Sequence, residues 1–76
     1  MNLEKFIKDF EEAFETVEPG SLLAETKYRD LNSWDSLAVL AITDIVEMEY
    51  GVLLNKKDFE DANTIGELYD CIIQKQ

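Results

Sequence analysis

Residues 34–54 read WDSLAVLAITDIVEMEYGVLL, and this stretch decides the fold. An acid and a serine, Asp35 and Ser36, stand immediately before a run that is mostly apolar. Both residue types are favoured at helix N-caps, because their side-chain oxygens accept orphan backbone N–H groups. Gly51 follows the run and can supply the left-handed residue with which many helices end. The pattern predicts a helix from about Asp35 or Ser36 to Tyr50.

The residues before this helix predict another helix and a long loop. Apolar residues at steps of three and four indicate an amphipathic helix over residues 2–17, which the EPGS turn at 18–21 ends. Residues 20–35 show no clean period, so a loop with short turns is expected. Four apolar side chains are expected to hold this loop to the core: Leu22, Leu23, Tyr28 and Leu31.

The residues after Gly51 predict two further helical elements. Lys56 to Asp61 suit one short turn around Phe59. Thr64 is followed three residues later by Glu67, the signature of a capping box that begins a last helix. The predicted fold class is all-α, a small bundle of three main helices plus one short helix, in a single domain over residues 1–76.

Composition narrows the choice of partners. The chain of 76 residues has 7 basic and 17 acidic side chains and a formal net charge of −10. Nucleic acids and anionic membrane surfaces are bound by Lys and Arg, so this charge argues against both. It favours proteins with a basic patch. No apolar run approaches the length of a membrane span, and the acidic start resembles neither a signal peptide nor a transit peptide. We expect a cytoplasmic monomer without membrane insertion, whose single cysteine, Cys71, fits a reducing compartment.

Apart from its carboxylates, the chain is poor in the residues that most often carry catalysis or bind metals. The chain has no histidine, one cysteine and three glycines, which leaves no nucleophile–histidine pair, zinc site or glycine-rich nucleotide loop. The stretch DANTIGELYDCI, residues 61–72, approaches a calcium loop, but Ile65 and Ile72 stand where oxygen ligands belong. The sequence therefore predicts no metal site, no catalytic residue and no enzyme.

Ser36 has two interpretations that do not exclude each other. It can simply begin a helix, or it can bear a phosphate ester where partial positive charge and free N–H donors tolerate one best. A helical projection places Leu37, Leu40, Asp44 and Glu47 away from the natural core face. Exposed apolar groups rimmed by acids are typical of a protein-binding surface. The alternative is that the preceding loop covers the two leucines.

The order of these elements resembles the acyl carrier protein family over essentially the whole chain. The sharpest likeness is the Asp-Ser-Leu triplet at its offset from EMEYGV in residues 34–54. The resemblance implies that Ser36 bears 4′-phosphopantetheine, which a phosphopantetheinyl transferase (holo-carrier synthase) transfers from coenzyme A. The distal thiol of this arm then holds an acyl group as a thioester, and the carrier presents it to partner enzymes that have basic and apolar docking patches.

The resemblance also implies roles for the residues around Ser36. Asp35 is expected to orient the docked transferase, and Leu37 to fill an apolar pocket on partners. The expected docking residues are Trp34, Leu40, Asp44 and Glu47. Ala38 and Ala41 stand where fatty-acid carriers often have acids, and Trp34 stands where a small residue is common. The docking surface is therefore expected to be more apolar than theirs, while Trp34 suits loop packing as well as a partner contact.

Three functions remain open at this stage. The first is an acyl carrier of fatty-acid, polyketide-like or other specialised biosynthesis in a bacterial cytoplasm. The second is an aminoacyl (peptidyl-type) carrier loaded by an adenylating enzyme. The third is a small acidic adaptor without a prosthetic group, which uses the same exposed Leu37–Leu40 face.

Overall fold

A computed structural model gives the fold and describes residues 3–14, 20–31 and 34–76. These residues form four α-helices and one 3₁₀-helix, and no strand occurs among them. The elements in chain order are α1 (Leu3–Glu12), η1 (Tyr28–Asp30), α2 (Ser36–Tyr50), α3 (Lys56–Asp61) and α4 (Ile65–Lys75). The predicted all-α class, with three main helices and a short one, is confirmed.

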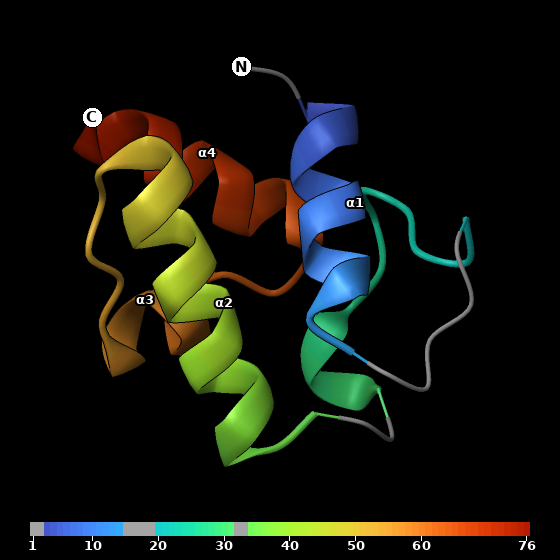
Figure 1. The fold of residues 1–76 in the computed structure, drawn as a ribbon. Helices are drawn as coiled ribbons and strands as arrows, with labels where there is room; N and C mark the ends of the chain where they lie inside the picture. The colour runs from blue at the N-terminus through green and yellow to red at the C-terminus, as the bar shows by residue number, and fades with distance from the viewer. Residues whose placement is uncertain (1–2, 15–19, 32–33) are drawn as a thin grey trace.

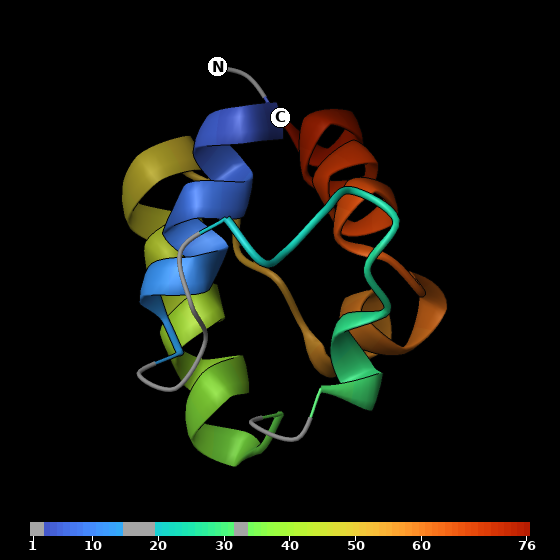
Figure 2. The ribbon, with the colours of Figure 1, turned by 90° about the vertical axis from the view of Figure 1, so that its right-hand side faces the viewer.

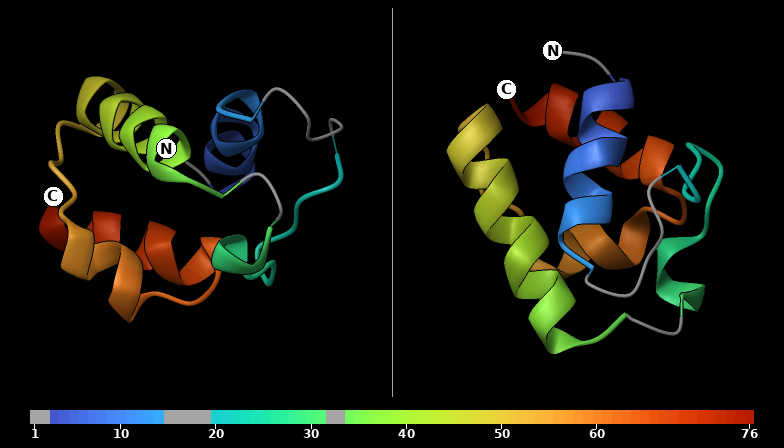
Figure 3. Two further views of the ribbon diagram at one scale, coloured as in Figure 1. Left: turned by 90° about the horizontal axis from the view of Figure 1, so that it is seen from below. Right: turned by 45° about the vertical axis from the view of Figure 1, so that its right-hand side comes forward.

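The helices lie in two layers, with α1 and α2 in one and α3 and α4 in the other (Figure 3, left). Helix α4 packs against both α1 and α3. Helix α2 begins at the lower end of the molecule in Figure 1, the end at which η1 also lies. The segment that contains η1 crosses from the α1 side to the side of α3 and α4 (Figure 2).

Local capping interactions set the helix boundaries after residue 34. The Asp35 carboxylate accepts a hydrogen bond from the Ala38 backbone N–H at 2.9 Å, and Gly51 ends α2 with φ 68°. Asn55 begins α3 with a capping box, and Thr64 begins α4 with another. The predicted ends of α2 and the predicted Thr64–Glu67 box are confirmed, because each depends on residues only a few positions apart.

The core is built from one apolar stripe of each helix and from the η1 segment. Helix α1 contributes Phe6 and Phe10, while the 3₁₀ turn contributes Tyr28, whose exposed fraction is 0%. Helix α2 turns only three side chains fully inward: Ala38, Ile42 and Val46. The remaining buried apolar residues are Phe14, Leu22, Val52, Leu54, Phe59, Ala62, Ile65, Leu68 and Ile72.

The first helix ends earlier than its periodicity predicts. Ala13 and Phe14 already lie outside α1, and their N–H groups donate to the carbonyls of Phe10 and Glu11. The Glu11 carboxylate is buried and accepts hydrogen bonds from loop amides 9 and 11 residues further along the chain. Helical periodicity cannot predict these long-range hydrogen bonds. The rest of the prediction, residues 15–17, lies outside the described residues.

The loop before α2 is held against α4 by its backbone. The N–H groups of Ile65 and Gly66 donate to the carbonyls of Thr26 and Ala24 at 3.1 and 2.8 Å. A Cβ added to Gly66 would lie 3.1 Å from the Ala24 oxygen, so any larger residue would push the two backbones apart by a few tenths of an ångström. Leu22 and Tyr28 are buried and Leu31 is half-buried, as predicted.

The prediction for Leu23 was wrong, because its side chain is 54% exposed. The Leu23 N–H donates to the Thr26 hydroxyl at 2.8 Å, and the Thr26 N–H donates to the Leu23 carbonyl at 3.0 Å. These two bonds form a tight local turn, and Leu23 lies on its exposed side. The apolar character of a loop residue does not reveal which side of such a turn it occupies.

Candidate functional site

Ser36 is the first residue of α2, and its side chain is exposed. The preceding residue, Asp35, has an extended backbone with φ −152° and directs its carboxylate onto the Ala38 N–H. Asp35 thereby makes the cap and leaves Ser36 outside it. Among the described residues, no hydrogen-bond partner occupies the Ser36 hydroxyl. This oxygen is therefore accessible at the surface of the molecule.

The electrostatic setting of Ser36 suits an added phosphate. The first turn of a helix carries unpaired N–H groups and a partial positive charge. The cap uses the N–H of Ala38, while the N–H groups of Ser36 and Leu37 have no acceptor among the described residues. The first turn of α2 also contains no acidic residue. A phosphodiester on Ser36 would lie beside donors that the fold leaves available.

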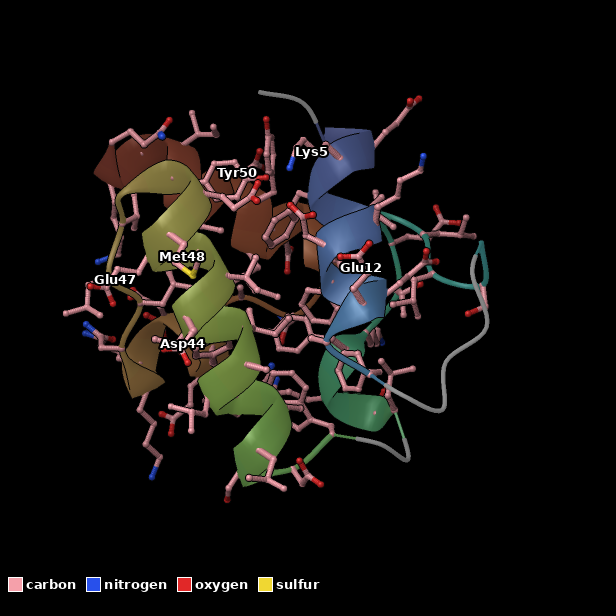
Figure 4. All side chains as sticks on the ribbon, viewed as in Figure 1. Lys5, Glu12, Asp44, Glu47, Met48 and Tyr50 are labelled. Atoms are coloured by element: carbon pink, nitrogen blue, oxygen red, sulfur yellow. The ribbon has the colours of Figure 1, made fainter. Side chains whose placement is uncertain are left out.

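The outer face of α2 is exposed, as the helical projection predicts. Leu37 is 75% exposed and Leu40 is 58% exposed, so the loop does not cover them. Asp44 and Glu47 are exposed one and two turns further along. Asp44, Glu47 and Met48 all project outward from α2 in Figure 4. The structure therefore brings the predicted leucines and acids together on one continuous surface.

Met48 is a feature of this surface that the sequence prediction did not count as a docking residue. Its side chain is 85% exposed, the largest exposure among the large apolar residues that the structure describes. Met48 lies eleven residues, or about three turns, after Leu37, so a helical projection puts both residues on the same side of the helix. That angular proximity was the available signal in the sequence.

Trp34 lies differently from the other predicted docking residues. Its side chain is half-buried and packs against the core. The indole lies 4.9 Å from the Tyr28 ring and 5.8 Å from the Phe59 ring, measured between centroids. The packing role proposed for Trp34 is thus observed, while a partner contact by this residue stays a prediction.

Cys71 carries the single thiol of the chain, and its surroundings do not favour the thiolate. Burial, followed by the nearby Asp58 carboxylate, raises the pKa of the Cys71 thiol, which opposes formation of a nucleophilic thiolate. No group of three or more metal-binding side chains gathers among the described residues. In the same part of the chain, no helix is long and apolar enough to span a membrane.

Comparison with known proteins identifies the family. A family model described as "Phosphopantetheine attachment site" matches residues 10–72, a span that includes all of α2 and the exposed Ser36. No curated protein and no solved structure matches the chain significantly. Domains of the matched family carry a covalently attached 4′-phosphopantetheine and are typically non-catalytic carriers. The chain therefore belongs to the phosphopantetheine attachment-site family and is a carrier protein of the kind that its resemblance to acyl carrier proteins predicted.

Proposed function

We propose that Ser36 is the attachment residue and that the chain carries acyl intermediates as thioesters on its phosphopantetheine arm. The observation that supports this most directly is the exposed Ser36 hydroxyl at the capped start of α2, within the matched residues. Structure and chemistry favour the same residue, because the helix start both exposes the oxygen and offers N–H donors to a phosphate.

The attachment step assigns separate tasks to the carrier and to its transferase. The Ser36 oxygen bonds to the phosphorus that joins pantetheine to the rest of coenzyme A, and adenosine 3′,5′-bisphosphate leaves. The hydroxyl proton is assigned to a base of the transferase, because the neighbouring Asp35 carboxylate is engaged with the Ala38 N–H. Asp35 keeps its carboxylate on the Ala38 N–H and thereby holds the helix start in place during the transfer. This chain acts as substrate and presenter, and not as an enzyme.

Partner enzymes are proposed to dock on the outer face of α2, named here the docking face: Leu37, Leu40, Asp44 and Glu47. Its apolar end adjoins Ser36, while Asp44 and Glu47 lie roughly 10 and 15 Å further along, at 1.5 Å rise per residue from Leu37. A complementary enzyme offers an apolar pocket beside its active-site entrance and basic side chains behind it. Such charges increase association rates and fix orientation more than they add affinity, which suits a shuttle.

The identity of the attachment residue is tested by co-expression with a broad-range phosphopantetheinyl transferase, followed by intact mass. The wild type is expected to gain one phosphopantetheine, and Ser36→Ala none. The matched control is Ser21→Ala, at another exposed serine that the structure describes, which should keep the modification. An unmodified wild type, or a Ser36→Ala variant that still gains the arm, contradicts the proposal.

The docking face is tested with Leu40→Asp. Leu40 is 58% exposed, so the change should leave helicity and unfolding midpoint intact while it weakens binding to a partner enzyme. Leu23→Asp, at a leucine 54% exposed on the distant loop, has the same charge change and should keep wild-type binding. Loss of helicity in Leu40→Asp, or equal weakening by both variants, contradicts the proposed face.

The class of cargo is a separate question. Resemblance to acyl carriers supports fatty-acyl or polyketide-like cargo, whereas the aromatic and polar residues before Asp35 are the support for an aminoacyl cargo. Incubation of the modified protein with an adenylating enzyme or with an acyl-loading enzyme encoded nearby distinguishes the two by intact mass. The adaptor without a prosthetic group is not retained, because the family carries the arm.

A further inference from the structure

Trp34 is surrounded by aromatic rings at the end of the molecule where α2 begins. Its ring is nearly parallel to that of Phe10, with centroids 6.3 Å apart and an interplanar angle of 5°. The rings of Phe14, Tyr28 and Phe59 lie 6.2, 4.9 and 5.8 Å away. All four neighbours are at most 5% exposed. The indole of Trp34 therefore packs against rings from α1, η1 and α3, and against Phe14, which follows α1.

The backbone joins this indole closely to Ser36. Trp34 precedes the N-cap residue Asp35, and an apolar residue at that position fixes the direction in which a chain enters a helix. The Trp34 N–H donates to the Leu31 carbonyl at 3.0 Å, and the Asp35 carbonyl accepts from the Val39 N–H at 3.1 Å. The orientation of Ser36 is thus linked to the position of the indole through one capping residue.

The first two turns of α2 have few other anchors in the core. Ser36, Leu37 and Leu40 are exposed. Of the inward residues, Ala38 is buried but small, and Val39 is half-buried. The first large side chain of α2 that is fully buried is Ile42, nearly two turns after Ser36. Trp34 is consequently the largest apolar anchor close to the attachment residue.

We propose that Trp34 is a positioning residue for the modification of Ser36, acting through the Asp35 cap and without contact with the transferred group. This inference rests on the proposed attachment at Ser36. The aromatic contacts fix the first turn of α2, and the fixed turn aims the Ser36 oxygen at the phosphorus in the docked transferase. A smaller side chain at residue 34 releases the turn, although Leu40, Asp44 and Glu47 of the docking face lie further along α2 and keep their places.

This role predicts a defined kinetic change. In Trp34→Leu, the transferase still binds the docking face, but Ser36 is correctly placed in a smaller fraction of the complexes. We expect kcat for transfer from coenzyme A to fall about tenfold while KM changes by less than about twofold. A direct contact between Trp34 and the transferase would instead raise KM and leave kcat unchanged.

The experiment measures kcat and KM with a broad-range phosphopantetheinyl transferase, together with amide hydrogen exchange of the carrier alone. Exchange at Ala38 and Val39 should accelerate in Trp34→Leu, because their N–H groups donate to Asp35 in the turn that Trp34 anchors. Phe6→Leu is the matched control, since Phe6 is 1% exposed and lies among other aromatic rings. It should reduce global stability and leave kcat and relative exchange at the α2 start unchanged.

Trp34→Phe keeps a ring in the same place and should restore most of kcat. It also replaces Trp34→Leu if the latter does not fold, with a smaller acceleration of Ala38 exchange expected. The proposal is overturned by unchanged exchange at Ala38, by an effect on KM alone, or by an equal loss of kcat in Phe6→Leu. A wild type that is not modified at Ser36 contradicts the proposed function instead, while the exchange experiment still tests the anchoring role of Trp34.

Discussion

The hydroxyl of Tyr28 joins the segment before α2 to α3, and its removal tests this connection. Tyr28 is fully buried, and its hydroxyl lies 2.6 Å from the Phe59 carbonyl and 2.8 Å from the Ala62 carbonyl. Phe59 lies within α3 and Ala62 is its C-cap residue. One hydroxyl is therefore the shared hydrogen-bond donor of two backbone carbonyls near the end of this short helix. The substitution Tyr28→Phe removes the donor and keeps the ring.

The cost follows from the two acceptors that lose their donor. A buried polar group left without its partner costs about 1–3 kcal/mol. We expect Tyr28→Phe to lower the free energy of unfolding by about 1–3 kcal/mol. For a domain of this size the total is roughly 4–11 kcal/mol, so the loss is a substantial fraction. The melting temperature should fall by about 4–8 °C for each kcal/mol lost.

Tyr50 offers the matched control. Its hydroxyl is buried and has no hydrogen-bond partner among the described residues, although its ring lies 6.0 Å from the Phe6 ring. In Figure 4, Tyr50 lies at the end of α2 toward which Lys5 extends from α1. Removal of an unpaired buried hydroxyl leaves no orphan partner behind. Tyr50→Phe should therefore be neutral, or stabilising by up to about 1 kcal/mol.

Urea denaturation followed by circular dichroism measures both variants, and the slope of each transition shows whether the unfolding remains comparable. The expected order of unfolding midpoints is Tyr28→Phe below the wild type, with Tyr50→Phe at or above it. Equal midpoints for the two variants would refute the argument, because they would show that the hydrogen bonds of Tyr28 contribute nothing beyond its ring.

Three further predictions concern charge and backbone conformation. Burial raises the pKa of Tyr28 from 10.0 to about 12. The contribution of the neutral phenol to the free energy of unfolding should therefore be fully present below pH 10 and decrease as pH rises toward about 12. Urea midpoints across this range should decrease less in Tyr28→Phe than in the wild type. Glu11→Ala removes the acceptor of two loop amides and should cost about 1–3 kcal/mol by urea denaturation, while Glu11→Gln, which keeps a carbonyl oxygen, should cost less. Gly51→Ala should lower the melting temperature by roughly 4–8 °C, because φ is 68° at the end of α2 and a side chain in this conformation costs about 1 kcal/mol. Ala62 ends α3 with φ −85°, so an exchange between alanine and glycine at that position involves no such backbone strain.

The sequence predicts helix α2 and its caps well because their determinants are local. Asp35, Ala38 and Gly51 act within a few residues of the helix ends, so the residue order alone specifies both boundaries. The Thr64 capping box is local in the same sense. The end of α1 was not predictable in this way, since Glu11 receives hydrogen bonds from residues beyond the following turn.

The exposed part of the site was also predictable, for a different reason. An apolar arc wider than one buried stripe indicates that some side chains must remain outside, and Leu37 and Leu40 are exposed as expected. A helical projection does not show how completely each side chain is exposed, and the 85% exposure of Met48 comes only from the structure. The environment of Trp34 depends on rings from α1, η1 and α3 that only the tertiary fold brings together.

The distribution of buried residues explains how α2 can expose so much apolar surface in a small domain. Its fully buried side chains are Ala38, Ile42 and Val46, with Val39 and Tyr50 packed partly against the core, while α4 buries Ile65, Leu68 and Ile72. The outer leucines, Leu37 and Leu40, therefore contribute little to the core. A change on that face alters what a partner meets, whereas a change beneath it alters the helix that presents Ser36. The stability of the domain thus depends on the inner side of α2, and what a partner contacts depends on its outer side. The two are linked most directly at the first turn of α2, which contains Ser36.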